Sequence, residues 1–355
     1  MAMSLMREEI REQPAALERT LERELPRLEE LRRAFSRQRP PFILLAARGT
    51  SDNAAHFGRY LLEIATGIPC ALAAPSVFTV YKARPDLAGA LVIAISQSGE
   101  STDTNLVLER AAELGALTVG ITNEAHSTLA RLASHVILVH AGRERSVAAT
   151  KTYTGQLMAL YLLAYALGAP IQPDDLRRLP GVAAAALETE SEIGQLAVRY
   201  RFMNDVAVVG RGLNYANALE FSLKLMETCS IVAEGFSAAD FLHGPIAMVE
   251  RSFPVFLFAP GGPTWRAIKQ VMEKLRRRGA ETLAITDNSN REAQRMASRA
   301  IQVSVKTGRR RPSPADLYTP IPYIIPAQLF ACSLAEEKGL DPDCPSGLTK
   351  VTRTL

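Results

Sequence analysis

The 355-residue sequence contains no apolar run long enough to cross a membrane. Its longest apolar stretches, such as residues 90–95 and 254–260, fall far below the roughly 18 residues that a spanning helix needs. Up to residue 35 the chain carries a charge every few positions, whereas a signal peptide needs an uninterrupted apolar segment. We therefore expect a cytoplasmic protein that has no membrane partner.

Motifs for metals, disulfides and nucleotides are also missing. The four cysteines are widely scattered, form no CxxC pair and have no close histidine: Cys70, Cys229, Cys332 and Cys344. This excludes a zinc site or a disulfide framework, and we expect reduced, mostly packed thiols and no metal. Neither Arg-Gly turn has a G-x-G-x-x-G fingerprint, and no Walker A sequence occurs. We therefore expect no dinucleotide or other organic cofactor.

The charge balance does not favour nucleic acid as a partner. The formal net charge is only +4, and the basic clusters at residues 276–278 and 309–311 are short and lack interleaved aromatic residues. Such clusters are typical of a solvated face rather than a nucleic-acid site.

The chain repeats itself. Two stretches, beginning at residues 42 and 205, each read as a buried strand, a turn that starts Arg-Gly and an amphipathic helix. An offset of 163 residues joins three pairs: Gly49 with Gly212, Phe78 with Phe241 and Gly99 with Gly262. These matches indicate a tandem duplication. At roughly 150 residues per domain, the length also predicts about two domains.

Within each copy, apolar runs of a few residues alternate with helical stretches such as residues 103–114 and 266–277. Continuous apolar strands separated by helices predict an α/β doubly wound parallel sheet that is covered on both faces. We expect a helical segment at 1–40, a first domain at 41–185, a second at 186–338 and an irregular tail at 339–355.

The first copy contains a candidate phosphate loop. Its strand at residues 91–96 leads into a loop of hydroxyl, amide and glycine residues and then into a helix: Ser96, Gln97, Ser98, Gly99, Ser101 and Thr102. Ligands of open α/β sheets bind at the carboxyl ends of strands, where helix N-termini favour anions. Serine and threonine are also common helix caps, but the sister loop at 259–264 has lost most of the hydroxyls. We therefore expect anion binding in the first copy alone.

The motifs RGTS, SQSGES, VAATKTYT, ALEFSLKLMET, FLHGP and LTKVT occur in this order between Arg48 and Thr352. Together they resemble the isomerase half of glucosamine-6-phosphate synthase, which is a pair of sugar isomerase (SIS) domains. The resemblance implies that Ser96, Gln97, Ser98 and Ser101 hold a sugar phosphate. It places the first-strand turn nearby, with Gly49, Thr50 and Ser51, and it aligns Ala149 with a substrate contact.

The resemblance also implies four catalytic positions. Glu227 matches the carboxylate that moves a proton between C1 and C2, and His243 matches the imidazole that opens the sugar ring. Lys350 matches a lysine near the carbonyl end of the sugar, and Lys224 matches a further active-site lysine. Histidine suits proton transfer near neutral pH. Glu227 and Lys224, three residues apart on one helix, could instead form a plain surface ion pair.

Two departures from the synthases bear on the substrate. Arg48 stands where they have a small residue such as cysteine, and Ala149 stands where they have serine. A third concerns the N-terminus, because Ala2 stands where the synthases have the cysteine nucleophile of a glutaminase domain. We therefore expect that this chain does not hydrolyse glutamine itself.

These features favour a deaminase that converts glucosamine 6-phosphate and water to fructose 6-phosphate and ammonia, as stand-alone double-SIS deaminases do. An ammonia-dependent aminotransferase-type isomerase, a fructosamine-6-phosphate deglycase and a sugar-phosphate sensor without activity are the alternatives. The resemblance also implies a homodimer with shared active sites. A sensor has no need for Glu227, His243 and Lys350 together, and no helix-turn-helix segment precedes residue 40.

Overall fold

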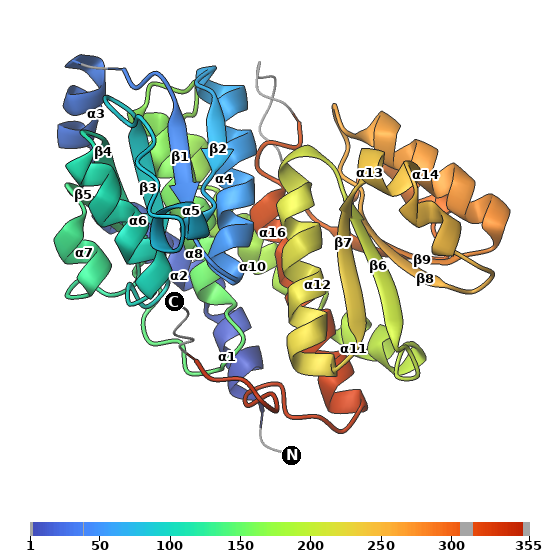
Figure 1. The fold of residues 1–355 in the computed structure, drawn as a ribbon. Coiled ribbons are helices and arrows are strands. Elements are labelled where there is room, and N and C mark those ends of the chain that lie inside the picture. Colours follow the sequence, from blue (N-terminus) through green and yellow to red (C-terminus); the bar gives the residue numbers. More distant parts are fainter. Residues whose placement is uncertain (1–2, 38, 306–314, 351–355) are drawn as a thin grey trace. The chain divides into compact units, whose positions relative to one another are not determined.

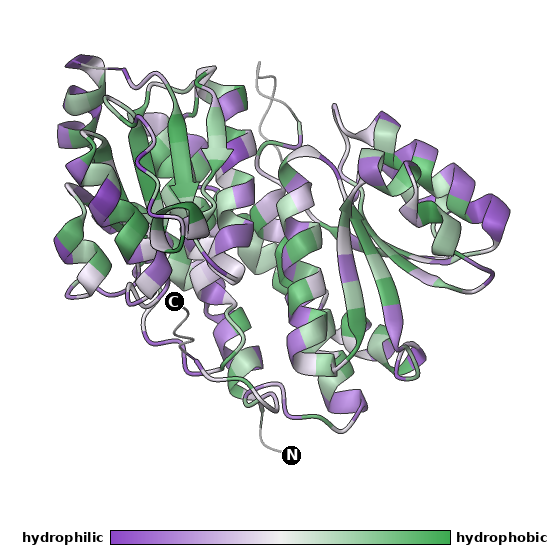
Figure 2. Ribbon diagram, viewed as in Figure 1, coloured by the Kyte–Doolittle hydropathy of each residue, from purple (hydrophilic) through white to green (hydrophobic). Residues whose placement is uncertain are grey.

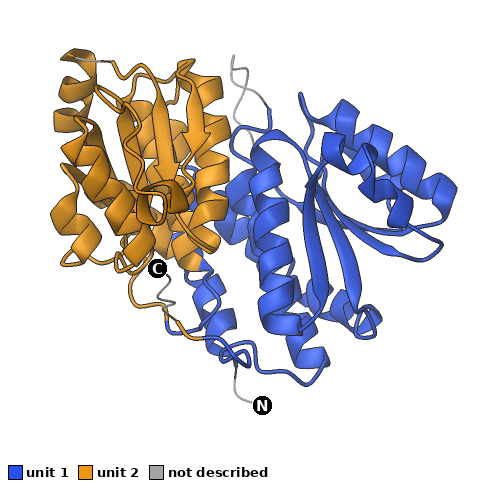
Figure 3. Ribbon diagram, in the orientation of Figure 1, with its two compact units in different colours: residues 1–14, 145–150, 178–348 blue, residues 15–144, 151–177, 349–355 orange. Residues whose placement is uncertain are grey.

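The computed structural model describes residues 3–37, 39–305 and 315–350. The chain divides into two compact units (Figure 3). Unit 1 comprises residues 1–14, 145–150 and 178–348, and unit 2 comprises residues 15–144, 151–177 and 349–355. The basic cluster at 309–311 and the last five residues lie outside the described ranges. None of the helices that the structure describes has the length and apolar character of a membrane span.

Unit 2 is built on a five-stranded sheet in the order β2-β1-β3-β4-β5, in which every neighbouring pair is parallel. The strands are β1 (Ile43–Ala46), β2 (Cys70–Leu72), β3 (Leu91–Ile95), β4 (Leu117–Thr122) and β5 (His135–Leu138). The central strand β3 is buried at every position, as its uninterrupted apolar sequence requires (Figure 2). Its carboxyl end therefore opens onto the same edge as that of β1.

Helices cover both faces of this sheet (Figure 1). On one face α4 (Thr50–Thr66) packs against α8 (Lys151–Ala166), which also contacts α3 (Leu28–Arg37). On the other, α6 (Thr102–Glu113) contacts both α5 (Pro75–Thr79) and α7 (Thr128–Leu132). The remaining helical segments of this part of the chain are α2 (Gln13–Glu24), η1 (Leu25–Arg27) and α9 (Pro173–Leu176).

Unit 1 repeats the arrangement with the sheet order β10-β9-β8-β6-β7, again parallel throughout. Its strands are β6 (Asp205–Gly210), β7 (Val232–Ser237), β8 (Pro254–Phe258), β9 (Glu281–Asp287) and β10 (Arg299–Val303). One helical group joins α16 (Pro320–Glu337) to α10 (Leu179–Leu187), α11 (Glu190–Arg199) and α12 (Tyr215–Cys229). The other contains α13 (Ala238–Leu242), α14 (Trp265–Arg278) and α15 (Arg291–Met296). Two short 3-10 turns complete the unit: η2 (Gly212–Asn214) and η3 (Pro245–Met248).

The predicted fold class is confirmed: two doubly wound parallel sheets follow each other along the chain. The strand orders are the same when the second is read from β7. Phe78 in α5 and Phe241 in α13 are both buried, each in the apolar core of its own unit. Gly49 and Gly212, the turn glycines of the two copies, both have φ near +60°. The duplication inferred from the sequence is therefore visible in backbone conformation and in packing.

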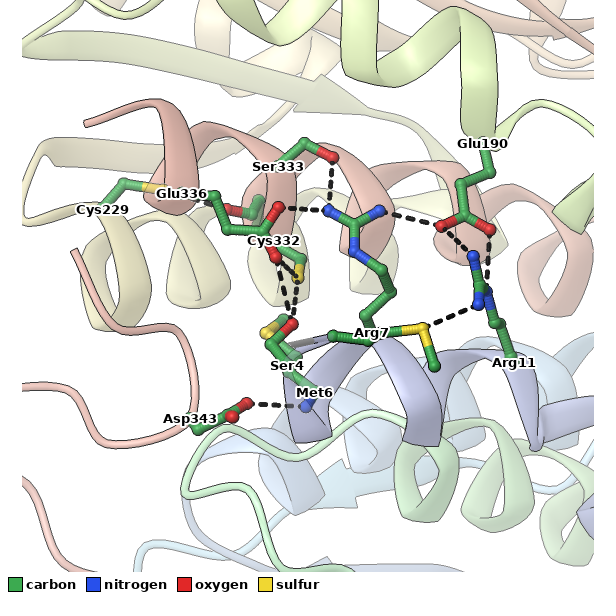
Figure 4. A network of polar contacts seen from close by, with 12 residues as sticks. Ser4, Met6, Arg7, Arg11, Glu190, Cys229, Cys332, Ser333, Glu336 and Asp343 are labelled. Carbon is green, nitrogen blue, oxygen red and sulfur yellow. Dashed lines mark hydrogen bonds and ion pairs between the residues drawn. The ribbon is translucent and has the colours of Figure 1, made fainter. Parts of the chain in front are cut away.

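The first helix, α1 (Leu5–Arg11), is attached to unit 1 by polar contacts (Figure 4). Asp343, in the segment after α16, accepts hydrogen bonds from the backbone N–H groups of Leu5 (2.8 Å) and Met6 (2.7 Å). A carboxylate at this end satisfies amides that the helix itself cannot. Arg7 forms ion pairs with Glu190 of α11 and Glu336 of α16. The N-terminal helix and the C-terminal segment thus hold each other in place.

Candidate functional site

The loop that follows β3 is shaped by Gly99. This residue has φ of +66°, a conformation that favours glycine, and a Cβ on it would lie 2.1 Å from Ser127 Oγ. Its carbonyl oxygen accepts hydrogen bonds from the Leu129 backbone N–H and from Asn105 Nδ2, both at 3.0 Å. The loop is therefore held in one conformation, with α6 beginning directly behind it at Thr102.

The three serines of the loop lie along its backbone. Ser96 Oγ accepts the Gly99 N–H at 3.1 Å, and Ser98 Oγ accepts the Glu100 N–H at 3.3 Å. Ser101 Oγ lies 3.0 Å from Thr104 Oγ1 at the start of α6. A hydroxyl that accepts a hydrogen bond can still donate its own proton. The loop thus combines hydroxyl donors with the amide-rich end of a helix, which is the chemistry that binds a phosphate.

The turn after β1 lies at the same edge of the sheet, because β1 pairs directly with β3. Gly49 caps α4, Thr50 begins it, and Ser51 is buried with its Oγ accepting a hydrogen bond from Gln156 Nε2 at 2.9 Å. Arg48 extends to the first turn of α6, where its Nε and Nη2 atoms lie 3.2 and 2.7 Å from Asp103 Oδ2. The two loops are joined by this ion pair.

The sister loop in unit 1 is contacted by a carboxylate from the neighbouring strand end, Asp287 of β9. Asp287 Oδ2 accepts the Gly261 N–H at 3.1 Å and the Tyr323 hydroxyl at 3.1 Å, while Oδ1 accepts two backbone N–H groups and a hydroxyl of residues 289–290. Burial opposes ionisation, but the hydrogen bonds from Ser289 and Gly261 hold the pKa of Asp287 below its usual value. An ionised side chain on the loop amides repels a second anion. This contact accompanies the loss of hydroxyl residues from the second copy.

Helix α12 carries a row of charges that is mostly buried. Lys224 and Glu220 have no exposed side-chain surface, and Glu227 is 22% exposed. Lys224 Nζ lies 3.4 Å from Glu220 Oε1 and 2.5 Å from Glu227 Oε2. The pair of Lys224 and Glu227 is therefore not a plain surface ion pair, because its lysine is fully removed from water. Glu220 was missed in the sequence, although its spacing of four residues from Lys224 places both on one helix face.

His243 ends α13 in an exposed turn. Its backbone N–H donates to the Asp240 carbonyl oxygen at 3.0 Å. Among the residues that the structure describes, no hydrogen bond or ion pair engages its imidazole. The ring is thus presented to solvent and available to a ligand or to another protein surface.

Lys350 belongs to unit 2, like the phosphate loop. Its Nζ atom lies 3.2 Å from Oε2 of Glu144, whose side chain is fully buried. Glu144 also accepts hydrogen bonds from the Thr152 N–H (3.2 Å) and the Thr152 hydroxyl (2.6 Å) at the start of α8. Sequence reasoning missed Glu144, because nothing near it in the chain indicates a partner 206 residues away.

Ala149 lies in the segment 145–150, which clusters with unit 1. Buried Glu9 of α1 accepts hydrogen bonds from the Arg145 N–H (2.5 Å) and the Ser146 N–H (3.2 Å). At the other end of the segment, the Thr150 carbonyl oxygen accepts from Gln328 Nε2 at 3.3 Å. The backbone on both sides of Ala149 is thus anchored.

The four cysteines are free thiols, of which Cys229 and Cys332 are buried, Cys70 is half-buried and Cys344 is exposed. Burial raises the pKa of Cys229 to about 11 and that of Cys332 to about 12, which keeps both protonated. Within the described ranges, no group of three or more histidine, cysteine, aspartate or glutamate side chains is placed to hold a metal ion.

Residues 38–166 and 203–335 match the family model of the SIS domain. The chain belongs to the SIS family. It is 38% identical over 348 residues to a glutamine–fructose-6-phosphate aminotransferase (isomerizing) from Methanothermobacter thermautotrophicus, covering 97% of this chain and 56% of that protein. The chain thus spans little more than half the length of this curated relative.

Solved structures show the same architecture. The C-terminal domain of glucosamine-fructose-6-phosphate aminotransferase from Francisella tularensis is 27% identical, with a TM-score of 0.87 and coverage of 97% of this chain and 99% of that one. Glucosamine-6-phosphate deaminase from Thermotoga maritima is 21% identical, with a TM-score of 0.76 and coverage of 99% and 100%. At this level of identity, the similarity to the Thermotoga maritima structure shows a shared fold only.

The buried charges on α12 lead to a prediction about stability. Replacing Lys224 by Met leaves Glu220 buried without its cation, so we expect the free energy of unfolding to fall by about 3–5 kcal/mol. Urea denaturation of the purified variant measures this. Lys269→Met is the matched control, since Lys269 pairs with Glu292 at 2.6 Å but is solvent-exposed, and we expect little change there. Equal losses in the two variants would contradict the prediction.

Proposed function

We propose that this chain is an amino-sugar-phosphate deaminase and isomerase, which converts glucosamine 6-phosphate and water to fructose 6-phosphate and ammonia. The observation that carries the proposal is the row of Glu220, Lys224 and Glu227: a partly exposed carboxylate is held by a fully buried lysine. The hydroxyl-lined loop after β3 supports the phosphorylated substrate. Membership of the SIS family supports the reaction class.

In the proposed mechanism, His243 and Glu227 transfer protons at specific atoms of the sugar. His243 moves a proton from the C1 hydroxyl to the ring oxygen, which opens the sugar to its aldehyde. Glu227 removes the proton from C2 while O1 gains a proton, giving an enaminol, and Glu227 then delivers the C2 proton to C1. The amine gives up the proton that balances the one gained by O1. C1 becomes a primary alcohol and C2 an imine. Water then adds to C2, and ammonia leaves as fructose 6-phosphate forms.

Lys350 is assigned to the carbonyl or imine end of the open chain. Its ammonium group is paired with buried Glu144, which stabilises the positive charge in the absence of substrate. The phosphate is assigned to Ser96, Gln97, Ser98 and Ser101, with Ser51 of the neighbouring turn beside them. Ala149 adds no side-chain donor, so any contact with the sugar there comes from the backbone.

The direction of the reaction follows from the source of ammonia. The proposed residues act on carbon and oxygen atoms of the sugar, and none is assigned to glutamine. If ammonia exchanges with solution, mass action at low free ammonia favours its release. The aminotransferase names of the curated relatives favour the reverse synthesis as the second candidate.

We also propose a homodimer in which His243 serves the site of the other copy. The imidazole is exposed and has no hydrogen-bond or ion-pair partner among the described residues, which supports this assignment. Symmetric dimers are the commonest oligomers of soluble proteins.

The proposal is tested by incubating the purified protein with glucosamine 6-phosphate, without glutamine or added metal. We expect ammonia and fructose 6-phosphate to appear in equal amounts. Formation of glucosamine 6-phosphate from fructose 6-phosphate and ammonia, without the forward reaction, would favour the second candidate. Absence of both reactions, together with a rise in melting temperature on adding the sugar phosphate, would favour a deglycase or a sensor.

Glu227→Gln tests the proposed base. The amide cannot accept the C2 proton, so we expect kcat to fall by about 10²-fold or more, the typical contribution of general base catalysis. Binding of inorganic phosphate, which neither chain consumes, is measured by calorimetry and stays close to that of the unmodified chain because the phosphate contacts are elsewhere. Glu273→Gln, a change at an exposed position on α14, serves as the control. Turnover near the original rate in Glu227→Gln would rule out the base assignment.

Lys350→Arg tests whether Lys350 acts on the substrate through its amine or only forms the ion pair with Glu144. Arginine keeps a positive charge for Glu144 but cannot lose its proton near neutral pH, so it cannot act through a free amine. We therefore expect an unchanged melting temperature and a loss of most turnover. Lys82→Arg, at an exposed position of unit 2, is the control. If Lys350→Arg retains full turnover, the lysine acts only through its ion pair.

A further inference from the structure

The proposed phosphate loop has no cation of its own. Residues 96–104 contain two carboxylates, Glu100 and Asp103, and neither lysine nor arginine. Glu100 is directed to the next helix, where it accepts from the N–H (2.9 Å) and the hydroxyl (2.8 Å) of Thr128. Asp103 lies in the first turn of α6, behind the place where an anion would bind. A phosphate dianion at this loop would therefore meet negative charge unless a cation is supplied from outside it.

Arg48 is a cation beside this loop. It follows β1 by two residues, and β1 is the direct neighbour of β3, so both loops leave the same edge of the sheet. Its guanidinium is bonded to Asp103 at 2.7 Å, and the aspartate side chain is 5% exposed while that of Arg48 is 49% exposed. A nearly buried carboxylate thus holds a half-exposed guanidinium at the first turn of the helix.

The geometry of the pair leaves one side of the guanidinium unused. Both contacts are made from the Nε and Nη2 side, and both go to a single oxygen, Asp103 Oδ2. In the part of the chain that the structure describes, Nη1 forms no hydrogen bond. The edge formed by Nη1 and the second Nη2 proton is therefore available, and this fork matches two phosphate oxygens.

We propose that Arg48 is a phosphate-binding residue, which Asp103 positions so that its free edge contacts the phosphate group of the substrate. This deepens the proposed function and rests on it. In this arrangement Asp103 orients the guanidinium and offsets part of its charge, while the serines and the helix amides bind the remaining phosphate oxygens. The residue that distinguishes this chain from the synthases at the RGTS turn thus has a direct role in substrate affinity.

The test measures binding, so it does not depend on turnover. Calorimetry with inorganic phosphate gives Kd for the unmodified chain, Arg48→Ala and Arg48→Lys. For glucosamine 6-phosphate the same three chains are compared with Glu227→Gln added to each, so that the sugar is not consumed during the titration. We expect Arg48→Ala to raise Kd by about tenfold or more for both ligands, as the loss of a charge-assisted hydrogen bond implies. Arg48→Lys keeps the positive charge but lacks the planar pair of guanidinium nitrogens. We therefore expect its Kd to lie between those of the unmodified chain and Arg48→Ala.

The matched control is Arg110→Ala. Arg110 lies near the far end of the same helix, is 48% exposed and pairs with Glu113 at 2.7 Å. Arg110→Ala therefore removes the same charge and the same kind of ion pair from the same unit as Arg48→Ala does. We expect its Kd values to equal those of the unmodified chain, which would show that net charge alone does not explain the Arg48 effect.

The double variant Arg48→Ala with Asp103→Asn separates direct contact from neutralisation. If Arg48 contacts the phosphate, binding stays weak in the double variant. Recovery of the original Kd would mean that Arg48 only neutralises Asp103, and it would overturn the proposal, as would an unchanged Kd in Arg48→Ala. If Arg48→Ala does not fold, Arg48→Lys provides the test. A Kd for Arg48→Lys equal to that of the unmodified chain would show that the two-nitrogen edge of the guanidinium does not contact the phosphate.

Failure of the proposed function has a different signature. An unmodified chain that binds glucosamine 6-phosphate but neither deaminates nor isomerises it would refute the proposed reaction and leave the Arg48 comparison intact. An unmodified chain that binds neither the sugar phosphate nor inorganic phosphate would refute both.

Discussion

The structure depends on a steric constraint at the carboxyl ends of its parallel strands. There the backbone must turn sharply between a buried strand and a helix, and it does so through glycines with positive φ: Gly49, Gly99, Gly212 and Gly262. At Gly99 a Cβ would collide with Ser127, so the turn is specific to glycine for reasons of space as well as conformation. The helix amides can face a ligand because Gly99 brings the backbone close to the strand end without a side chain of its own.

The two copies share the same turn but differ in the charge of the side chain at the end of the neighbouring strand. In unit 1 the amide of Gly261 is satisfied by Asp287, a carboxylate of the chain itself. At the end of β4, the corresponding strand of unit 2, the sequence has Asn123, which is neutral and binds the Ala141 N–H and the Gly142 carbonyl oxygen. A single exchange of amide for carboxylate at this position therefore accompanies a difference in what the loop amides bond: a carboxylate in unit 1, and the neutral hydroxyls of Ser96 and Ser98 in unit 2.

The fold was predictable because its determinants are local. Continuous apolar strands and glycine turns are properties of short segments, and the offset of 163 residues is found by comparing such segments with one another. The structure confirms the parallel sheets they indicate. The positions of loop residues Ser96 and Ser98 at a strand end were predictable for the same reason. Glu144 and Asp103 were not, because their importance lies in pairs with Lys350 and Arg48 that are distant in sequence. Lone carboxylates of this kind have no local signature.

Those distant pairs share a physical feature, which is a carboxylate with almost no exposure beside a more accessible cation. Glu144 is fully buried beside Lys350, and Asp103 is 5% exposed beside Arg48. Burying a carboxylate is costly, and apolar replacements of buried ion pairs are often more stable. An exposed cation alone would be free to adopt many rotamers, whereas a neighbouring buried carboxylate restricts it to one region. The arrangement therefore gives up stability and gains cations of defined position, which is the property that a charged substrate requires.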